Sequence, residues 1–167
     1  MPLVAEAHGL AALLCLSSAR LPARLDDAGR FVPLADQDPA RWDRHLIALG
    51  HRHLQAAHAL SAVGPFQLEA AINAVHCARA AGAAPDWPTL RRLYEALQLL
   101  APTAGGGVAL AAVIAEIDGA AAGLASLDAA QDTARLQPAW VLRAHLLRRL
   151  GDFGGADAAL RRAIDLP

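Results

Sequence analysis

Histidine is the residue type in this chain best suited to acid–base or metal chemistry, and the chain has seven histidines. An imidazole titrates near neutral pH, so it can take up or release a proton under ordinary conditions. His53 falls within an apolar stripe at helical spacing, where a buried imidazole must find a hydrogen-bond partner. We expect His53 either to be a hydrogen-bonded core residue or to line a cavity. The stripe comprises Trp42, Leu46, Leu49, His53, Ala56 and Leu60.

His76 and Tyr94 are the other candidates for catalysis, because an imidazole and a phenol can both exchange protons in a suitable environment. A ligand site is usually an apolar pocket with a few polar groups. If this chain has one, we expect it between the second, third and fourth helices, where His53, Gln67, His76 and Tyr94 could converge.

The strongest polar cluster is Asp36-Gln37-Asp38, which directly precedes Pro39. Aspartate followed by proline is the favoured pairing at a helix start, so the cluster is expected to cap the second helix and to fix the preceding loop. Trp42 is expected to be buried and to anchor that helix. A partner or ligand would be bound by the same region, and the predicted binding residues are Asp36, Gln37, Asp38, Trp42, His53 and Gln67.

The sequence predicts neither a metal site nor a cofactor. His51 and His58 lie seven residues apart outside the stripe, where they are expected to be exposed, and no cysteine or carboxylate completes a metal-binding set. All basic residues are arginine, which removes lysine-based covalent chemistry. Gly105-Gly106-Gly107 is interpreted as a flexible connector in preference to an anion site.

Composition favours one soluble helical domain over residues 1–167. Alanine and leucine dominate the apolar residues, which is typical of packed helices. The net charge of −1 and the lack of a basic face argue against direct DNA binding.

Cys15 and Cys77 are expected as core thiols in a reducing cytoplasm. The uncharged stretch 96–115 is expected to be two helices joined by a loop and not a membrane span.

The periodicity of apolar residues and the helix-start signals predict an all-α fold of about eight helices. Pro39 is taken as the first residue of the second helix, and Gly64-Pro65 opens the third. The expected helices are approximately Pro2–Arg20, Pro39–Val63, Gly64–Gly82, Asp86–Ala101, Val108–Ile117, Ala120–Leu127, Pro138–Gly151 and Gly154–Asp165.

The last two expected helices fit a tetratricopeptide (TPR) repeat. Gly119 precedes Gly151 by 32 residues, close to the ~34-residue TPR period, which indicates a weaker repeat before the last one. The overall architecture is therefore expected to be a TPR-like α-α superhelix, most evident at 108–167. The positions that indicate the last repeat are Ala144, Leu147, Leu150 and Gly151 in its first helix and Phe153, Ala156, Leu160 and Ala163 in its second.

Residues 24–44 carry a more specific pattern, R-x-D-x-x-G-x-x-V-x-L-x-x-Q-D-x-x-x-W-D-R. This pattern resembles the start of the C-terminal TPR-like extension of a group of extracytoplasmic-function (ECF) sigma factors. The similarity extends along the chain through Gly64-Pro65-Phe66-Gln67 with His76, Asp86-Trp87 with Tyr94, and Leu150-Gly151. It implies a structural role for Gln67, His76 and Tyr94.

The chain departs from this group in two respects. The promoter-reading regions that lie upstream of the extension in the family are absent from this sequence. A polar Asn-Arg pair of the family pattern is replaced here by Ala109 and Leu110.

The resemblance implies a protein-interaction domain that regulates transcription initiation through contacts with the sigma core or RNA polymerase. The alternative is a stand-alone relative that binds or transforms a small molecule in a helix-lined cavity, because fold alone does not fix function. Under both hypotheses we expect a cytoplasmic protein without a membrane segment.

Overall fold

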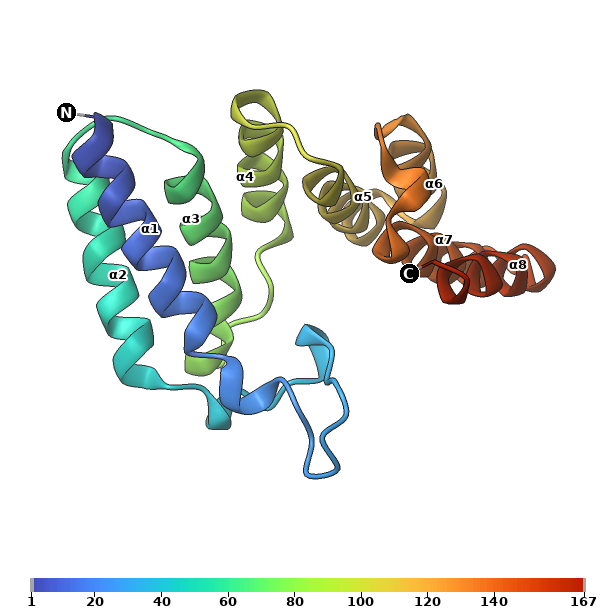
Figure 1. Cartoon of the computed structure of the whole chain (residues 1–167), viewed down its shortest axis with the longest axis horizontal. Helices are drawn as coiled ribbons and strands as arrows, with labels where there is room; N and C mark the ends of the chain where they lie inside the picture. The colour runs from blue at the N-terminus through green and yellow to red at the C-terminus, as the bar shows by residue number, and fades with distance from the viewer. Residues whose placement is uncertain (1, 167) are drawn as a thin grey trace. The chain divides into compact units, whose positions relative to one another are not determined.

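The computed structural model describes residues 2–166, and every long element in this range is a helix (Figure 1). The all-α prediction of about eight helices is therefore confirmed. Extended backbone pairs within this range at an isolated antiparallel bridge between Leu25 and Phe31. The helices are α1 (Pro2–Ser18), α2 (Arg44–Ala59), α3 (Pro65–Cys77), α4 (Trp87–Leu100), α5 (Ala104–Asp118), α6 (Ala120–Ala129), α7 (Gln137–Arg149) and α8 (Phe153–Ile164).

The chain divides into two compact units, Met1–Asp86 and Trp87–Pro167. The first contains α1 to α3 and the long connector between α1 and α2. The second contains α4 to α8. That the whole of 1–167 behaves as the single domain expected from the sequence stays a prediction.

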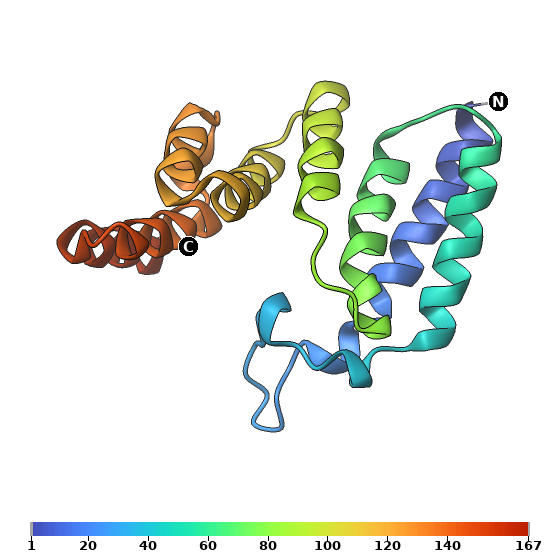
Figure 2. The same cartoon turned by 180° about the vertical axis from the view of Figure 1, so that it is seen from behind.

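In the first unit, α1 packs against both α2 and α3 (Figures 1 and 2). Its contact face consists mainly of small residues, which lets the three helix backbones approach closely. Ala12 and Leu16 of α1 form the centre of the core with Ala70 and Cys77 of α3. Cys77 is a core residue, as expected, and its burial raises the pKa of its thiol.

The second helix begins five residues later than predicted, at Arg44. Asp38 does act as a cap, because its carboxylate accepts the Ala40 N–H at 2.9 Å, but it caps only a 3₁₀ turn, Pro39–Arg41. Asp43 then caps α2 itself by accepting the N–H groups of His45 and Leu46 at 2.8 and 3.0 Å. Two caps in succession separate the turn from the helix.

The buried face of α2 is rotated relative to the predicted stripe. Ile47 and Leu54 pack against the α1–α3 core. Gly50 and Ala57 are the buried residues of α2. Leu60, the last residue of the predicted stripe, is 38% exposed. The stripe was placed one position off because Gly50 and Ala57 are too small to stand out in a hydrophobic pattern.

Residues Pro2–Ala23 form a helical segment of 22 residues with a mean hydropathy of 1.4, which is long and apolar enough to cross a membrane. Core helices of soluble proteins share these properties, and the buried face of α1 packs inside the first unit.

The uncharged stretch 96–115 is interrupted between Leu100 and Ala104, so two helices joined by a loop are confirmed there.

The second unit is a succession of packed helix pairs, in which α5 pairs with α6 and α7 with α8. Gly119 and Gly151 join the members of each pair, with φ angles of 95° and 83° that favour glycine. The two glycines are 32 residues apart, but the turns differ, because Gly119 has a ψ of 166° and is the one residue between α5 and α6, whereas three residues separate α7 from α8. The cores of this unit comprise Val108, Ala111, Leu127 and Ala139, and Ala115, Ala120 and Leu146.

The α7–α8 pair packs mainly through alanines. Ala144 of α7 and Ala156 and Ala163 of α8 are buried, as predicted for the last repeat. Phe153 and Leu160 were expected in the same interface, but they are 69% and 39% exposed. The helices meet through their smallest residues, so the larger side chains of α8 remain on its outer face.

Thr103 starts α5 by accepting the Gly106 N–H at 3.0 Å. The run Gly105-Gly106-Gly107 therefore forms the first turn of α5 and is not the flexible connector that was predicted. The helix begins at Ala104 because a threonine cap and a preceding proline outweigh the low helix propensity of glycine.

Candidate functional site

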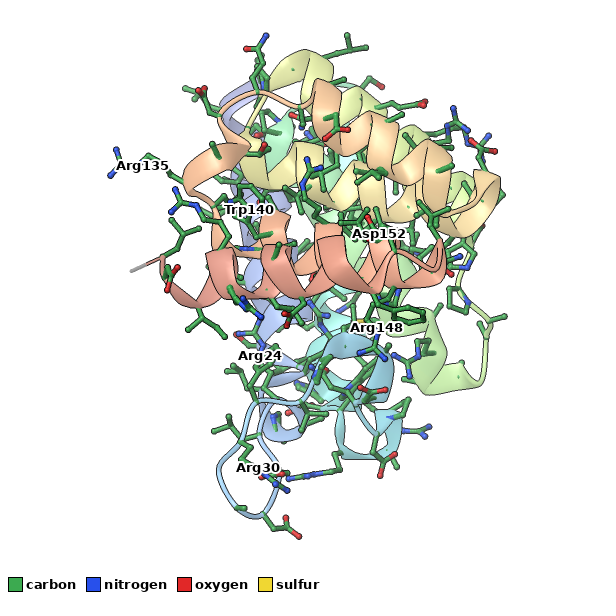
Figure 3. All side chains as sticks on the ribbon, turned by 90° about the vertical axis from the view of Figure 1, so that its right-hand side faces the viewer. Arg24, Arg30, Arg135, Trp140, Arg148 and Asp152 are labelled. Atoms are coloured by element: carbon green, nitrogen blue, oxygen red, sulfur yellow. The ribbon has the colours of Figure 1, made fainter. Side chains whose placement is uncertain are left out.

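The connector between α1 and α2 carries most of the sequence signature, and its first part is a turn held by Asp26. The Asp26 carboxylate accepts the Ala28 and Arg30 N–H groups, both at 2.9 Å, and pairs with the Arg30 guanidinium at 2.8 Å (Figure 3). These bonds from Arg30 lower the pKa of the Asp26 carboxyl. Gly29 lies within the turn at a φ of 75°. Asp26 and Gly29 thus determine the shape of the turn.

The predicted polar cluster divides into an inward and an outward part. Gln37 is buried, with 4% of its surface exposed, and its amide donates to the Val32 carbonyl at 3.1 Å. Asp36 and Asp38 are exposed, and Asp38 caps the following turn. Gln37 and Asp38 therefore stabilise the connector, while binding of a partner by these three residues stays a prediction.

Trp42 is buried, with 3% of its surface exposed, as predicted. The guanidinium of Arg79 lies over its ring, 5.5 Å from the centroid. The same guanidinium donates to the carbonyls of Leu34, Ala35 and Gln37 at 2.5, 3.0 and 3.4 Å. Through these hydrogen bonds and the contact with the Trp42 ring, Arg79 holds the connector against the end of α3. Sequence analysis missed Arg79, because an isolated arginine after a helix has no local pattern.

The Gly64-Pro65-Phe66-Gln67 segment is held by Glu6 of α1. The Glu6 carboxylate accepts the backbone N–H groups of Phe66 and Gln67 at 3.0 and 3.4 Å and the Gln67 amide at 3.2 Å. It thus caps the N-terminus of α3 from a helix 60 residues away. A side chain at Gly64 would clash with this carboxylate, because a Cβ there would lie 2.3 Å from the Glu6 Cδ. Gln67 also donates to the Ala62 carbonyl.

His53 is paired with His8 of α1. Their Nδ1 atoms are 3.0 Å apart and their ring centroids 5.3 Å apart. One imidazole must donate and the other accept. His53 is half-buried and hydrogen-bonded at the α1–α2 interface, and its predicted role in binding stays a prediction.

This pairing makes a specific prediction about stability. We expect His53→Leu to lower the free energy of unfolding by about 1–2 kcal/mol, because the partly buried His8 ring loses its partner. The His8→Leu/His53→Leu double variant should recover most of that loss, since both polar groups are then removed. Urea unfolding of the four proteins of this cycle measures the coupling. The exposed His45→Leu is the matched control, and a neutral His53→Leu would contradict the pairing.

His76 and Tyr94 occupy surroundings different from that of His53. His76 lies in the last turn of α3, where burial and then the charges of Arg20 and Arg79 lower its pKa to about 4. It is therefore neutral at pH 7. Tyr94 lies on α4, in the second unit. The predicted convergence of these residues with His53 and Gln67 involves both units and stays a prediction, as does a catalytic role for them.

A pocket of about 470 Å³ does lie between α2 and α3. Its polar groups include Gln67, but the histidines that line it are His51 and His58, which the sequence analysis placed outside the site. Both are exposed, as predicted, and seven residues along a helix separate their Cα atoms by about 10 Å. The remaining lining is mostly apolar and includes Leu54, Ala59, Val63, Leu68 and Ala71.

A second pocket of about 560 Å³ lies in the second unit, at the start of α5 and the end of α6. Gln98 holds one wall, because its amide donates to the Thr103 carbonyl at 2.9 Å and accepts the Thr103 N–H at 2.8 Å. Leu110 is part of the apolar lining. The exposed rim carries an amide and a carboxylate, from Gln131 and Asp132. We call this pocket the α5–α6 groove.

In the second unit, an arginine stacked on a tryptophan stabilises the start of α7. Trp140 of α7 donates to the Ala134 carbonyl at 2.9 Å, and the Arg143 guanidinium lies 5.6 Å from its ring centroid (Figure 3). Arg143 also pairs with Asp128 of α6. Arginine stacked on tryptophan therefore occurs in both units, each time where a loop meets a helix.

Within residues 2–166, no three His, Cys, Asp or Glu side chains gather closely enough to hold a metal ion. The polar groups described above are mostly engaged with one another or with the backbone. The features available for binding thus include one pocket in each unit and a connector held in place by hydrogen bonds.

Comparison with known proteins gives two matches. Residues 1–58 match a family of unknown function, DUF6596. These residues contain α1, the connector and nearly all of α2. The chain is also similar to an uncharacterized protein of Rhizobium meliloti (strain 1021), with 34% identity over 99% of this chain. The chain spans 39% of that relative's length. No solved structure matches.

Proposed function

We propose that this chain is a TPR-like protein-interaction module related to the C-terminal extension of ECF sigma factors. It acts in transcription initiation by binding the sigma core or RNA polymerase, and it makes no DNA contact of its own. As a transcription component it works in the cytoplasm.

The observation that carries this proposal is the repetition of helix pairs in the second unit. The α5–α6 and α7–α8 pairs are joined by glycines 32 residues apart with similar positive φ angles. Repeats of this kind bury a continuous core between neighbours and present extended surfaces to protein partners. The signature residues Asp26, Gly29 and Trp42 determine the structure of the connector, which supports a resemblance at the level of fold.

The α5–α6 groove is the surface we assign to the partner. It combines an apolar floor at Leu110 with a rim that carries Gln131 and Asp132. This lining suits a short segment of a protein that inserts an apolar side chain and places a hydrogen-bond donor or a basic group at the rim.

The test is a pair of alanine-to-arginine variants on α6. Ala129 lines the groove, whereas Ala121 is equally exposed on the same helix but outside it. We expect Ala129→Arg to weaken binding to purified sigma core or polymerase core at least tenfold, because the added side chain fills the groove. Ala121→Arg should bind like the wild type. Surface plasmon resonance gives both affinities, and no saturable binding of the wild type would contradict the proposed function.

A second candidate function is small-molecule binding between α2 and α3. It is favoured by the 470 Å³ pocket, in which an apolar lining is flanked by two imidazoles. A compound that raises the melting temperature of the wild type but not that of His58→Ala would favour this function over the first.

A further inference from the structure

The face of α1 that points away from α2 and α3 is a stripe of exposed leucines. Leu3, Leu10, Leu14 and Leu21 are 88, 38, 57 and 54% exposed. The spacings of seven and four residues keep Leu3, Leu10 and Leu14 within about 40° of one another around the axis of α1, and Leu21 follows seven residues after Leu14. Leu21 belongs to the 3₁₀ turn Leu21–Ala23 that continues α1. We call these four residues the leucine stripe.

No charge interrupts the leucine stripe. The ionisable side chains of α1 and the residues that follow it point toward neighbouring helices: Glu6 caps α3, His8 bonds to His53, and Arg20 donates to Asn73 at 2.5 Å. Contiguous exposed apolar surface of this kind marks an interaction site. Because the leucine stripe is uncharged, another uncharged helix face can pack against it. Binding to anionic lipid headgroups would require basic residues, and the stripe has none.

The spacing of the leucine stripe is symmetric about Ala12. Leu10 and Leu14 lie two residues before and after Ala12, and Leu3 and Leu21 lie nine residues before and after it. Ala7 and Ser17 lie five residues to either side and complete a heptad pattern of a and d positions. If an identical helix lies antiparallel on this face, every leucine meets a leucine. A two-fold interface requires this self-complementarity, whereas a different partner does not.

We propose that the leucine stripe is a homodimer interface, in which α1 packs antiparallel against α1 of a second copy. Leu10 then contacts the partner's Leu14, and Leu3 contacts the partner's Leu21. One pair of helices buries less than the about 800 Å² per subunit of a standard interface, and interfaces of that small size are weak and transient. We expect a Kd on the order of 10 μM for such a dimer. This inference does not depend on the proposed function.

The test uses two single variants of the whole chain, Leu10→Glu and Leu14→Lys. Both residues are exposed, so the substitutions leave the core intact, and circular dichroism checks the fold. We expect sedimentation to show a wild-type monomer–dimer equilibrium in the micromolar range. Each variant alone should be monomeric at concentrations ten times higher. Leu99→Glu, at an 86% exposed leucine of the second unit, is the matched control and should dimerise like the wild type.

Mixing the two variants tests the antiparallel register. In the mixed dimer, Glu and Lys face each other at one contact, while the native leucines face each other at the symmetric one. An equimolar mixture should therefore recover at least half of the dimer. A wild type that stays monomeric up to ~500 μM, well above the expected Kd, would overturn the proposal. So would variants that fail to restore dimers on mixing, or a monomer that binds phosphatidylglycerol vesicles through the same leucines.

Discussion

Replacing Trp42 by alanine is expected to lower the free energy of unfolding by about 3–5 kcal/mol, the range for truncation of a buried aromatic side chain. Trp42 is 3% exposed and lies under the Arg79 guanidinium. Its loss removes the apolar contact between the connector and the rest of the first unit. It also removes the ring on which Arg79 rests.

Urea unfolding followed by far-UV circular dichroism measures this effect without relying on the fluorescence of the deleted residue. Phe31→Ala is the matched control, because Phe31 is an aromatic residue of the same connector that is 70% exposed. We expect it to cost less than about 1 kcal/mol. A Trp42→Ala variant as stable as Phe31→Ala would show that the tryptophan does not anchor the connector.

Replacing Arg79 by alanine is expected to destabilise the protein by about 2–3 kcal/mol, because three connector carbonyls lose a charged donor and the Trp42 ring loses its cation. Arg79→Lys should recover less than half of the loss. A single ammonium can neither reach three carbonyls at once nor lie flat on the ring.

The exposed Arg52 of α2 provides the control for the loss of a positive charge in the same unit. Arg52→Ala should change the free energy of unfolding by no more than about 0.5 kcal/mol. Full recovery of stability by Arg79→Lys would mean that charge alone, and not the planar geometry of the guanidinium, holds the connector.

The helices could be predicted from the sequence because their causes are local. Proline, glycine and aspartate at the helix ends, and apolar residues at helical spacing between them, predicted the number of helices correctly. The errors lie where two local signals compete. Asp38-Pro39 and Asp43 are both caps, and no local signal decides that the long helix starts after the second.

The arrangement of the site was less predictable, because its main contacts join residues far apart in the chain. Glu6 meets Gln67, His8 meets His53, and Arg79 meets the connector, over separations of 61, 45 and 42–45 residues. No spacing rule links such pairs. His53 was rightly identified as unusual, but its partner could not be named without the packing of α1 on α2.

The cap that Glu6 provides to α3 also has a consequence for synthesis on the ribosome. The chain emerges from its N-terminus, so α1 appears 60 residues before the Phe66 N–H group that Glu6 will accept. At about 5–20 residues per second, α1 waits roughly 3–12 s before α3 can close on it. During that interval the part of its alanine-rich face that α3 will cover is exposed, together with its leucine face. We therefore expect chaperones to bind nascent α1 until α3 has been made.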